Sequence, residues 1–346
     1  MSSSTLRPAG GAPSAGQPEH TARARGRVLP FPITGQEVVL IVVIAVLWVA
    51  LALTTPAFLT SGSIVPLLVA MAPVALIGVG MTVVIITGGI DVSVAGMVMV
   101  CAVVVARAMV ESGAPLPVAV LLSVALGGLL GLANGVLIAY GRVHAIIITF
   151  GTANLFRFLG LQLFGGTTVD NIPGTLAVFG RGEAGRTLGV PHSFLIMLVV
   201  AAAAWYYLRH TPSGRHLYAI GGDADAARLA GVKVQRRVLS AYVLTGLLTG
   251  LAACFVIARG TSTLAPNVGA GMELAAIAAV VIGGTSIMGG RGSVLGTVLG
   301  ALLVQTVTSG VTQLGWRSQL ASLFVGILIL IAVGADLLRE RTRRTA

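Results

Sequence analysis

The chain has 346 residues, of which 56% are hydrophobic and only 10% are charged. Soluble domains carry about 25% charged residues, so this composition excludes an ordinary soluble protein and indicates a polytopic membrane protein. The net charge of +11 does not indicate nucleic-acid binding, because the basic residues lie mainly beside apolar segments. Cys101 and Cys254 lie within apolar segments and lack metal-ligand spacing, so the sequence predicts neither a metal site nor a disulfide framework.

The first 36 residues differ from the rest of the chain. Residues 1–36 are rich in Ser, Pro, Gly and Arg and contain no apolar run, which predicts a disordered cytoplasmic tail. The first apolar segment, 38–53, follows at once without a small-residue cleavage site after it. We therefore expect it to be retained as a membrane helix and not removed as a signal peptide.

Apolar segments then recur along the chain. Because a bilayer core of about 30 Å needs about 20 helical residues, each segment is a candidate membrane helix. About ten transmembrane helices are predicted, at 38–53, 64–87, 92–111, 116–140, 145–164, 192–209, 238–259, 272–288, 293–314 and 317–338. The predicted fold class is all-α, with a transmembrane domain over 37–338 and a basic cytoplasmic tail at 339–346.

The basic residues orient these helices. With the N-terminus inside, sixteen Lys and Arg residues fall on the cytoplasmic side and four on the outer side. Positive residues are retained on the cytoplasmic side, so we expect both termini to be inside. The polar loop 209–237 is then cytoplasmic, and the loop 166–191 faces the outside.

Glycines recur at every fourth position in several apolar segments. Small residues at this spacing line one helix face and let neighbouring backbones approach closely, so we expect these glycines to be mainly structural. They are Gly127, Gly131 and Gly135; Gly246 and Gly250; and Gly292, Gly296 and Gly300.

Polar side chains at membrane depth or at helix ends are candidates for a transport pathway or a gate, because burying them there is costly. The candidates are Thr87, Asp91, Ser93, Asn134, Asn154, Arg157, Thr285 and Ser286. Structural alternatives remain for several of them: Asp91 as a helix N-cap, and Arg157 as a snorkelling side chain or ion-pair member. Glu273, at an outer helix start, is interpreted as complementing the helix dipole.

The loop 209–237 is the longest dense run of charge within the apolar part of the chain, and it holds the only lysine, Lys233. Its centre, 221–231, reads GGDADAARLAG. Asp223 is a suitable N-cap for a short helix, and Gly231 is a suitable stop. Ala226, Ala227 and Ala230 would give that helix a small-residue face able to dock a soluble partner. The alternative is a solvated loop whose bases merely follow the inside rule.

The sequence predicts no catalytic residues. The glycine-rich segment 283–292 resembles a phosphate loop but lacks lysine, and the only lysine lies elsewhere, so no Walker P-loop is present. Neither HExxH nor GxSxG occurs. The chain is therefore expected to be no enzyme, to need no cofactor, and to draw its energy from another molecule.

Five motifs in order resemble the permease subunits of bacterial ABC importers for sugars, the ribose, xylose and arabinose branch that includes autoinducer-2 and rhamnose permeases. The resemblance covers about 82–338. The motifs are TGGIDVS at 87–93, with Val92 for Leu; Asn134–Ile147; Gly151 and Thr152 with Arg157; Gly221–Val232, with Asp223 where Asn is common; and Glu273–Gly292.

This resemblance implies a type II importer-like permease in the inner or plasma membrane. It implies a cytoplasmic ATP-binding subunit, an extracytoplasmic sugar-binding protein, and a second permease copy or a sister permease as partners, with no nucleic acid. The sugar pathway would lie at the permease dimer interface, where some of the glycine faces would meet. The coupling helix that seats on the ATPase would use Gly221, Asp223, Ala226, Ala227, Arg228, Ala230 and Gly231.

Two other functions remain open from the sequence. An ion-coupled secondary transporter would need ionisable groups deep in the membrane, for which only Asp91, Arg107 and Arg157 qualify. An ABC permease for branched-chain amino acids is the other alternative, although the TGGID and GGTS…GGRG segments favour the sugar branch.

Overall fold

The computed structural model describes residues 34–345 except 142, 181 and 261, with side chains described as far as residue 334. The tail predicted over 1–36 lies almost wholly outside the described residues. Its last two positions do not belong to a tail, because α1 begins at Gly35.

Helices dominate the described part of the chain, as the all-α prediction requires. Eight of them are long and apolar enough to cross a membrane. They are α1 (Gly35–Thr54), α2 (Ser61–Ile86), α3 (Val94–Glu111), α4 (Leu116–Gly141), α5 (Ala145–Phe164), α6 (His192–His210), α9 (Val234–Arg259) and α11 (Val294–Gln313).

Two more apolar helices follow the predicted order, but one is much shorter than predicted. The segment expected to span at 272–288 forms α10 (Met272–Ile282), which rises only about 16 Å. The helix ends because Gly284 adopts a left-handed conformation (φ +92°) and the next N–H turns back to the carbonyl of Val280. An irregular segment, 283–293, then leads into α11.

The last helix, α12 (Gln319–Thr345), continues through most of the predicted basic tail at 339–346. The outer loop 166–191 contains two short 3₁₀ helices and a small antiparallel hairpin. These are η1 (Gly174–Phe179), η2 (Glu183–Gly185), β1 (Arg186–Thr187) and β2 (Val190–Pro191). The polar loop 209–237 holds α7 (Pro212–Gly222) and α8 (Ala224–Leu229).

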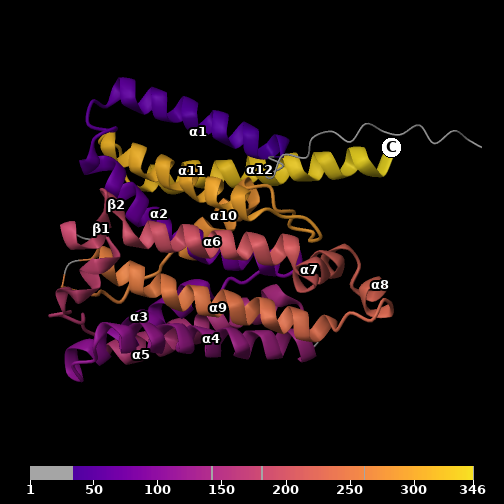
Figure 1. Ribbon diagram of the computed structural model, residues 1–346, viewed down its shortest axis with the longest axis horizontal. Coiled ribbons are helices and arrows are strands. Elements are labelled where there is room, and N and C mark those ends of the chain that lie inside the picture. Colours follow the sequence, from indigo (N-terminus) through magenta and orange to yellow (C-terminus); the bar gives the residue numbers. More distant parts are fainter. Residues whose placement is uncertain (1–33, 142, 181, 261, 346) are drawn as a thin grey trace, which may run out of the picture. The chain divides into compact units, whose positions relative to one another are not determined.

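The segments predicted to be cytoplasmic lie at one end of the bundle, and the predicted outer loop lies at the other. The start of α1 and the end of α12 lie at the same end of the bundle as α7 and α8, whereas the hairpin β1–β2 lies at the other end (Figure 1). Gln36, at the start of α1, donates a 3.2 Å hydrogen bond to the carbonyl of Ile282 at the end of α10. The segments that the charge pattern assigns to the cytoplasmic side therefore lie together.

Glycines set the closest helix contacts, and these contacts lie within the chain. A Cβ at Gly127 of α4 would lie 2.2 Å from the carbonyl oxygen of Gly246 in α9, and one at Gly250 would lie 2.2 Å from that of Ser123. Gly300 of α11 approaches the backbone of α10 in the same way. The prediction of close packing is confirmed. The suggestion that such glycine faces meet across a dimer interface is wrong for these glycines, because helices of the same subunit already occupy them.

Candidate functional site

The polar stretch 209–237 begins with a helix that the sequence reading did not predict. The hydroxyl oxygen of Thr211 accepts a 3.0 Å hydrogen bond from the N–H of Gly214, and Pro212 occupies the first helical position of α7. Capping by threonine satisfies an N–H that the helix cannot pair, and proline at this position has no N–H to lose. The Thr-Pro step is thus a helix-start signal readable from sequence.

The short helix predicted within 221–231 is present as α8. The Oδ1 atom of Asp223 accepts hydrogen bonds of 2.9 Å from the N–H groups of both Asp225 and Ala226. Gly231 adopts φ +84°, a conformation that glycine reaches without steric cost, and it closes the helical turn. Both ends of α8 are therefore fixed by the residues that predicted them.

The exposed face of α8 differs from the predicted one. Ala227 is 5% exposed and packs against Ile220 and Val234, so it belongs to the inward face. The outward face carries Leu229, which is 91% exposed, together with Ala226 and Ala230. The three-alanine contact face is corrected accordingly: two alanines and a leucine point outward, and Ala227 anchors the helix.

The end of α7 lies directly against the core of the bundle. A Cβ at Gly221 would lie 1.8 Å from the carbonyl oxygen of Ile86, the last residue of α2, and 2.3 Å from the nitrogen of Gly290. The phenol of Tyr218 donates a 3.0 Å hydrogen bond to the carbonyl of Gly292, and burial raises the pKa of this phenol. Backbone contact thus joins α7, α2 and the segment 283–293.

A buried polar cluster occupies the connection between α2 and α3. The Oδ1 atom of Asp91 accepts hydrogen bonds from the N–H (2.9 Å) and the hydroxyl (2.6 Å) of Ser93, and the amide of Asn134 donates to the same hydroxyl (2.7 Å). All three side chains are fully buried. Burial raises the pKa of the Asp91 carboxyl to about 6, against the lowering effect of these hydrogen bonds. Asp91 Oδ2, Asn134 Oδ1 and the hydroxyl of Tyr242 have no hydrogen-bond partner among the described residues.

A cavity of about 770 Å³ lies on the cytoplasmic side of this cluster, and we call it the inner vestibule. Its walls include Thr87 and Gly89 of the TGGIDVS motif and Tyr242 of α9. They also include His144, just before α5, and Arg228 of α8. The vestibule therefore reaches from α8 to the segment that contains Asp91.

A second cavity, of about 240 Å³, borders the segment that runs from Thr87 to the start of α3, and we call it the polar cavity. It is lined by Val92 next to Asp91, by Asn154 and Arg157 of α5, and by Asn267 and Glu273 before and within α10. The segment from Thr87 to the start of α3 thus contributes to the walls of both cavities.

Thr285 and Ser286 lie apart from both cavities. They are 2% and 1% exposed and belong to the irregular segment 283–293 that contacts α2 and α7. The predicted pathway residues therefore form separate groups: the cluster of Asp91, Ser93 and Asn134; Thr87 in the inner vestibule; Asn154 and Arg157 in the polar cavity; and Thr285 with Ser286.

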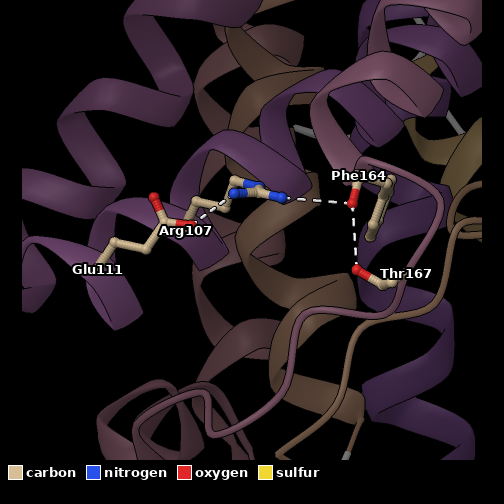
Figure 2. A network of polar contacts seen from close by, with 4 residues as sticks. All are labelled: Arg107, Glu111, Phe164 and Thr167. Atoms are coloured by element: carbon tan, nitrogen blue, oxygen red, sulfur yellow. Dashed lines mark hydrogen bonds and ion pairs between the residues drawn. The ribbon is translucent and has the colours of Figure 1, made fainter.

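Arg107, one of the three ionisable residues considered for a secondary transporter, has structural partners. It forms a 2.5 Å ion pair with Glu111 in α3 and donates a 3.3 Å hydrogen bond to the carbonyl of Phe164 at the end of α5. Figure 2 shows its side chain lying between these two groups, with the hydroxyl of Thr167 on the same carbonyl. The guanidinium of Arg107 thus links the end of α3 to the end of α5, which is a structural role.

Several residues at these sites escaped the sequence reading. Glu273 stood in a recognised motif but was interpreted only through the helix dipole, whereas the structure places it in a cavity wall. Tyr218, Tyr242 and Asn267 carried no local signal, because their partners are distant in the sequence. Leu229 was readable as the one large apolar residue of GGDADAARLAG.

Comparison with known proteins agrees with the motifs. A family model described as the branched-chain amino acid transport system / permease component matches residues 63–333. The chain belongs to this permease family. The match includes the transmembrane helices from α2 to most of α12, α7, α8 and both cavities, so the permease is a multi-pass membrane protein.

Relatives place the permease on the branch of the ABC sugar importers. The ribose import permease protein of Escherichia coli is 40% identical over 283 residues, which are 82% of this chain and 88% of that protein. That of Bacillus subtilis is 39% identical over 294 residues (84% and 89%), and the fructose import permease protein of Rhizobium meliloti is 34% identical over 275 residues (77% and 75%). No solved structure matches the chain. The predicted resemblance is confirmed, and neither the secondary transporter nor the branched-chain amino-acid permease is favoured.

Proposed function

We propose that the permease forms the membrane pathway for a monosaccharide, imported at the expense of ATP hydrolysed by a separate subunit. The observation that carries this proposal is the 40% identity to a ribose import permease over most of both chains. The absence of a Walker lysine from the whole sequence supports the need for a separate ATPase.

Three partners follow from this proposal. A cytoplasmic ATP-binding subunit would supply the energy, and an extracytoplasmic binding protein would deliver the sugar. A second permease copy or a sister permease would complete the pathway. The exposed polar face of α5 supports an assembly larger than this chain alone, because Asn154 and Arg157 do not suit lipid and must line an aqueous space or meet another protein.

The coupling element of the permease would be α8. Its geometry is fixed by the Asp223 cap, and Ala227 packs against Ile220 of α7, so a displacement of α8 would press on α7. Its outer surface offers Leu229 for apolar contact. Arg228 is held by a 2.6 Å ion pair with Asp225, which orients both side chains towards a partner's polar rim.

Transport by the complete system tests the proposed function. We expect cells without their own ribose and fructose uptake to accumulate radiolabelled D-ribose or D-fructose when the permease is expressed with its ATP-binding subunit and binding protein. Accumulation should disappear when the ATPase is inactivated by mutation. Import that continues without the ATP-binding subunit would contradict the proposal and favour a secondary transporter.

Asp91 is proposed to hold the TGGIDVS segment in the position that transport requires. Asp91→Ala removes the acceptor of both Ser93 donors, and a buried donor without a partner costs about 1–3 kcal/mol. We expect sugar uptake to fall about tenfold or more while the amount of permease in the membrane changes little. Asp170→Ala is the matched control, because Asp170 accepts only an exposed hydroxyl in the outer loop. Equal uptake by Asp91→Ala and the wild type would reduce Asp91 to a dispensable turn residue.

A further inference from the structure

One face of α5 carries polar residues that do not suit lipid. Asn154 and Arg157 are three residues apart, so they lie on the same side of the helix, and both are exposed. Arg157 is well inside α5, and within the described part of the chain it makes no ion pair. A guanidinium facing hydrocarbon costs several kcal/mol, so this face lines an aqueous space or meets another protein.

Another part of the lining of the polar cavity carries complementary groups. Glu273 presents an Oε2 atom that is buried and has no hydrogen-bond partner among the described residues. Asn267 lines the same wall from the segment before α10. Gly269 (φ +81°) holds this segment against α3, because its Cβ would lie 2.8 Å from the carbonyl oxygen of Ala95. The wall is thus built by close backbone packing.

The remaining lining is apolar. The aromatic ring of Phe150, which is 64% exposed, contributes to the cavity together with Val92 and Met99. An aromatic surface beside hydrogen-bonding side chains suits a ligand with one carbon–hydrogen face and a polar edge. The volume of about 240 Å³ equals that of about eight water molecules, which admits a small ligand.

The charges of the cavity select the ligand class. Arg157 only donates hydrogen bonds, the carboxylate of Glu273 only accepts them, and the amide groups of Asn154 and Asn267 do both. The two opposite charges form no ion pair with each other. The amide of Asn154 already donates one hydrogen bond to the carbonyl of Phe150 (2.9 Å), which leaves its second N–H and its oxygen for a ligand. A neutral molecule whose hydroxyls both donate and accept suits these groups together with Arg157, Glu273 and Asn267, whereas a charged ligand would be repelled by Arg157 or by Glu273.

We propose that the polar cavity is a monosaccharide-contact site within the permease itself, with Arg157 and Glu273 gripping sugar hydroxyls and Phe150 facing the ring. This inference rests on the proposed function and identifies where the sugar is held during transport. Val92 lies in the cavity wall one residue after Asp91, so a bound sugar touches the segment that separates the polar cavity from the inner vestibule.

Protection of an introduced cysteine tests this site. The native Cys101 and Cys254 are buried, so a cysteine at Ala153, which lines the cavity, reports accessibility against a low background. We expect D-ribose or D-fructose to slow labelling of Ala153→Cys by a small methanethiosulfonate about fivefold at four times the dissociation constant. Adding Arg157→Gln or Glu273→Gln should remove this protection without changing the thermal stability of the permease in nanodiscs. Leu229→Cys, on the exposed face of α8, is the control site that neither sugar should protect.

The outcomes separate this inference from the proposed function. The inference is overturned if the sugar that the wild-type transporter imports fails to protect Ala153→Cys. It is also overturned if both glutamine variants keep full protection. If the glutamine variants lose the second permease copy, and sugar protects neither them nor the wild type, the inference is likewise overturned, because the face would then be a subunit contact. Protection without ATP-driven uptake by the wild type would support the sugar site and contradict the proposed function.

Discussion

Gly221→Ala is expected to reduce sugar import about tenfold or more while the ATP-binding subunit still binds. The added Cβ would lie 1.8 Å from the carbonyl oxygen of Ile86 and 2.3 Å from the nitrogen of Gly290, which is much closer than two non-bonded heavy atoms can approach. Both neighbours are backbone atoms, so they cannot rotate away. Overpacking of this kind costs about 1–3 kcal/mol, and the end of α7 must separate from α2.

This contact has consequences for transport because of what lies behind it. Gly290 donates a 2.9 Å hydrogen bond to the carbonyl of Ile86, so α2 and the segment 283–293 are joined at the point where α7 touches both. α2 is the most buried of the candidate membrane spans, and it leads directly into the Asp91 segment. If α8 is the coupling element, as we propose, its movement and that of α7 would reach the pathway through this backbone contact. Separating the surfaces should therefore leave ATP hydrolysis running without import.

Gly222→Ala is the matched control for this effect. The two glycines are neighbours at the end of α7, and a Cβ at Gly222 would meet no atom within 4 Å. The measurement is the ratio of sugar imported to ATP hydrolysed in proteoliposomes, with copurification of the ATP-binding subunit as the check on assembly. If Gly221→Ala kept the wild-type ratio, or if Gly222→Ala lowered it equally, the backbone contact would not transmit the coupling movement.

Much of the fold was predictable because its signals are local. Long apolar segments located the spans, and the basic residues placed α7 and α8 at the same end of the bundle as the start of α1 and the end of α12. Asp223 and Gly231 predicted the two ends of α8, since capping and a left-handed glycine act within a few residues. The start of α7 at Thr211 and Pro212 was equally local but went unread.

What the sequence missed depends on contacts between distant segments. A helix of six residues has too little periodicity to show which face is buried, and the inward orientation of Ala227 follows from Ile220 and Val234. Hydropathy alone extended α10 to residue 288, although two glycines end it at Ile282.

Spacing of small residues likewise reveals close packing but not the partner. Gly127 and Gly246 lie in segments that the sequence reading kept separate, and only the fold shows that they face each other. The polar cavity has the same origin: Arg157 and Glu273 were each interpreted alone, one as an ion-pair candidate and the other as a dipole partner. Their shared cavity arises because the segment before α10 packs against α3.

Leu229→Asp is expected to release the ATP-binding subunit while the permease stays folded. Leu229 ends α8 with 91% of its surface exposed, so no packing within the described chain depends on it. Burial of a leucine side chain in a partner contributes about 1.5–3 kcal/mol, which corresponds to a change in affinity of about 10- to 150-fold. A carboxylate at this position would in addition have to lose its water on binding. We therefore expect the amount of ATP-binding subunit that copurifies with the permease to fall about tenfold or more.

Two further substitutions of the same kind make the result specific. Leu188→Asp places the same change on a leucine that is 99% exposed in the outer hairpin, and aspartate tolerates its left-handed conformation (φ +53°), so assembly should be unaffected. Ala227→Asp would instead bury a carboxylate against Ile220 and Val234, and it should lower the thermal stability of the permease alone.

Normal recovery of the ATP-binding subunit with Leu229→Asp would show that α8 does not dock through its outward face. Loss of the subunit in Ala227→Asp without any loss of stability would return Ala227 to the docking surface, because only an exposed side chain can disturb binding and leave folding unchanged.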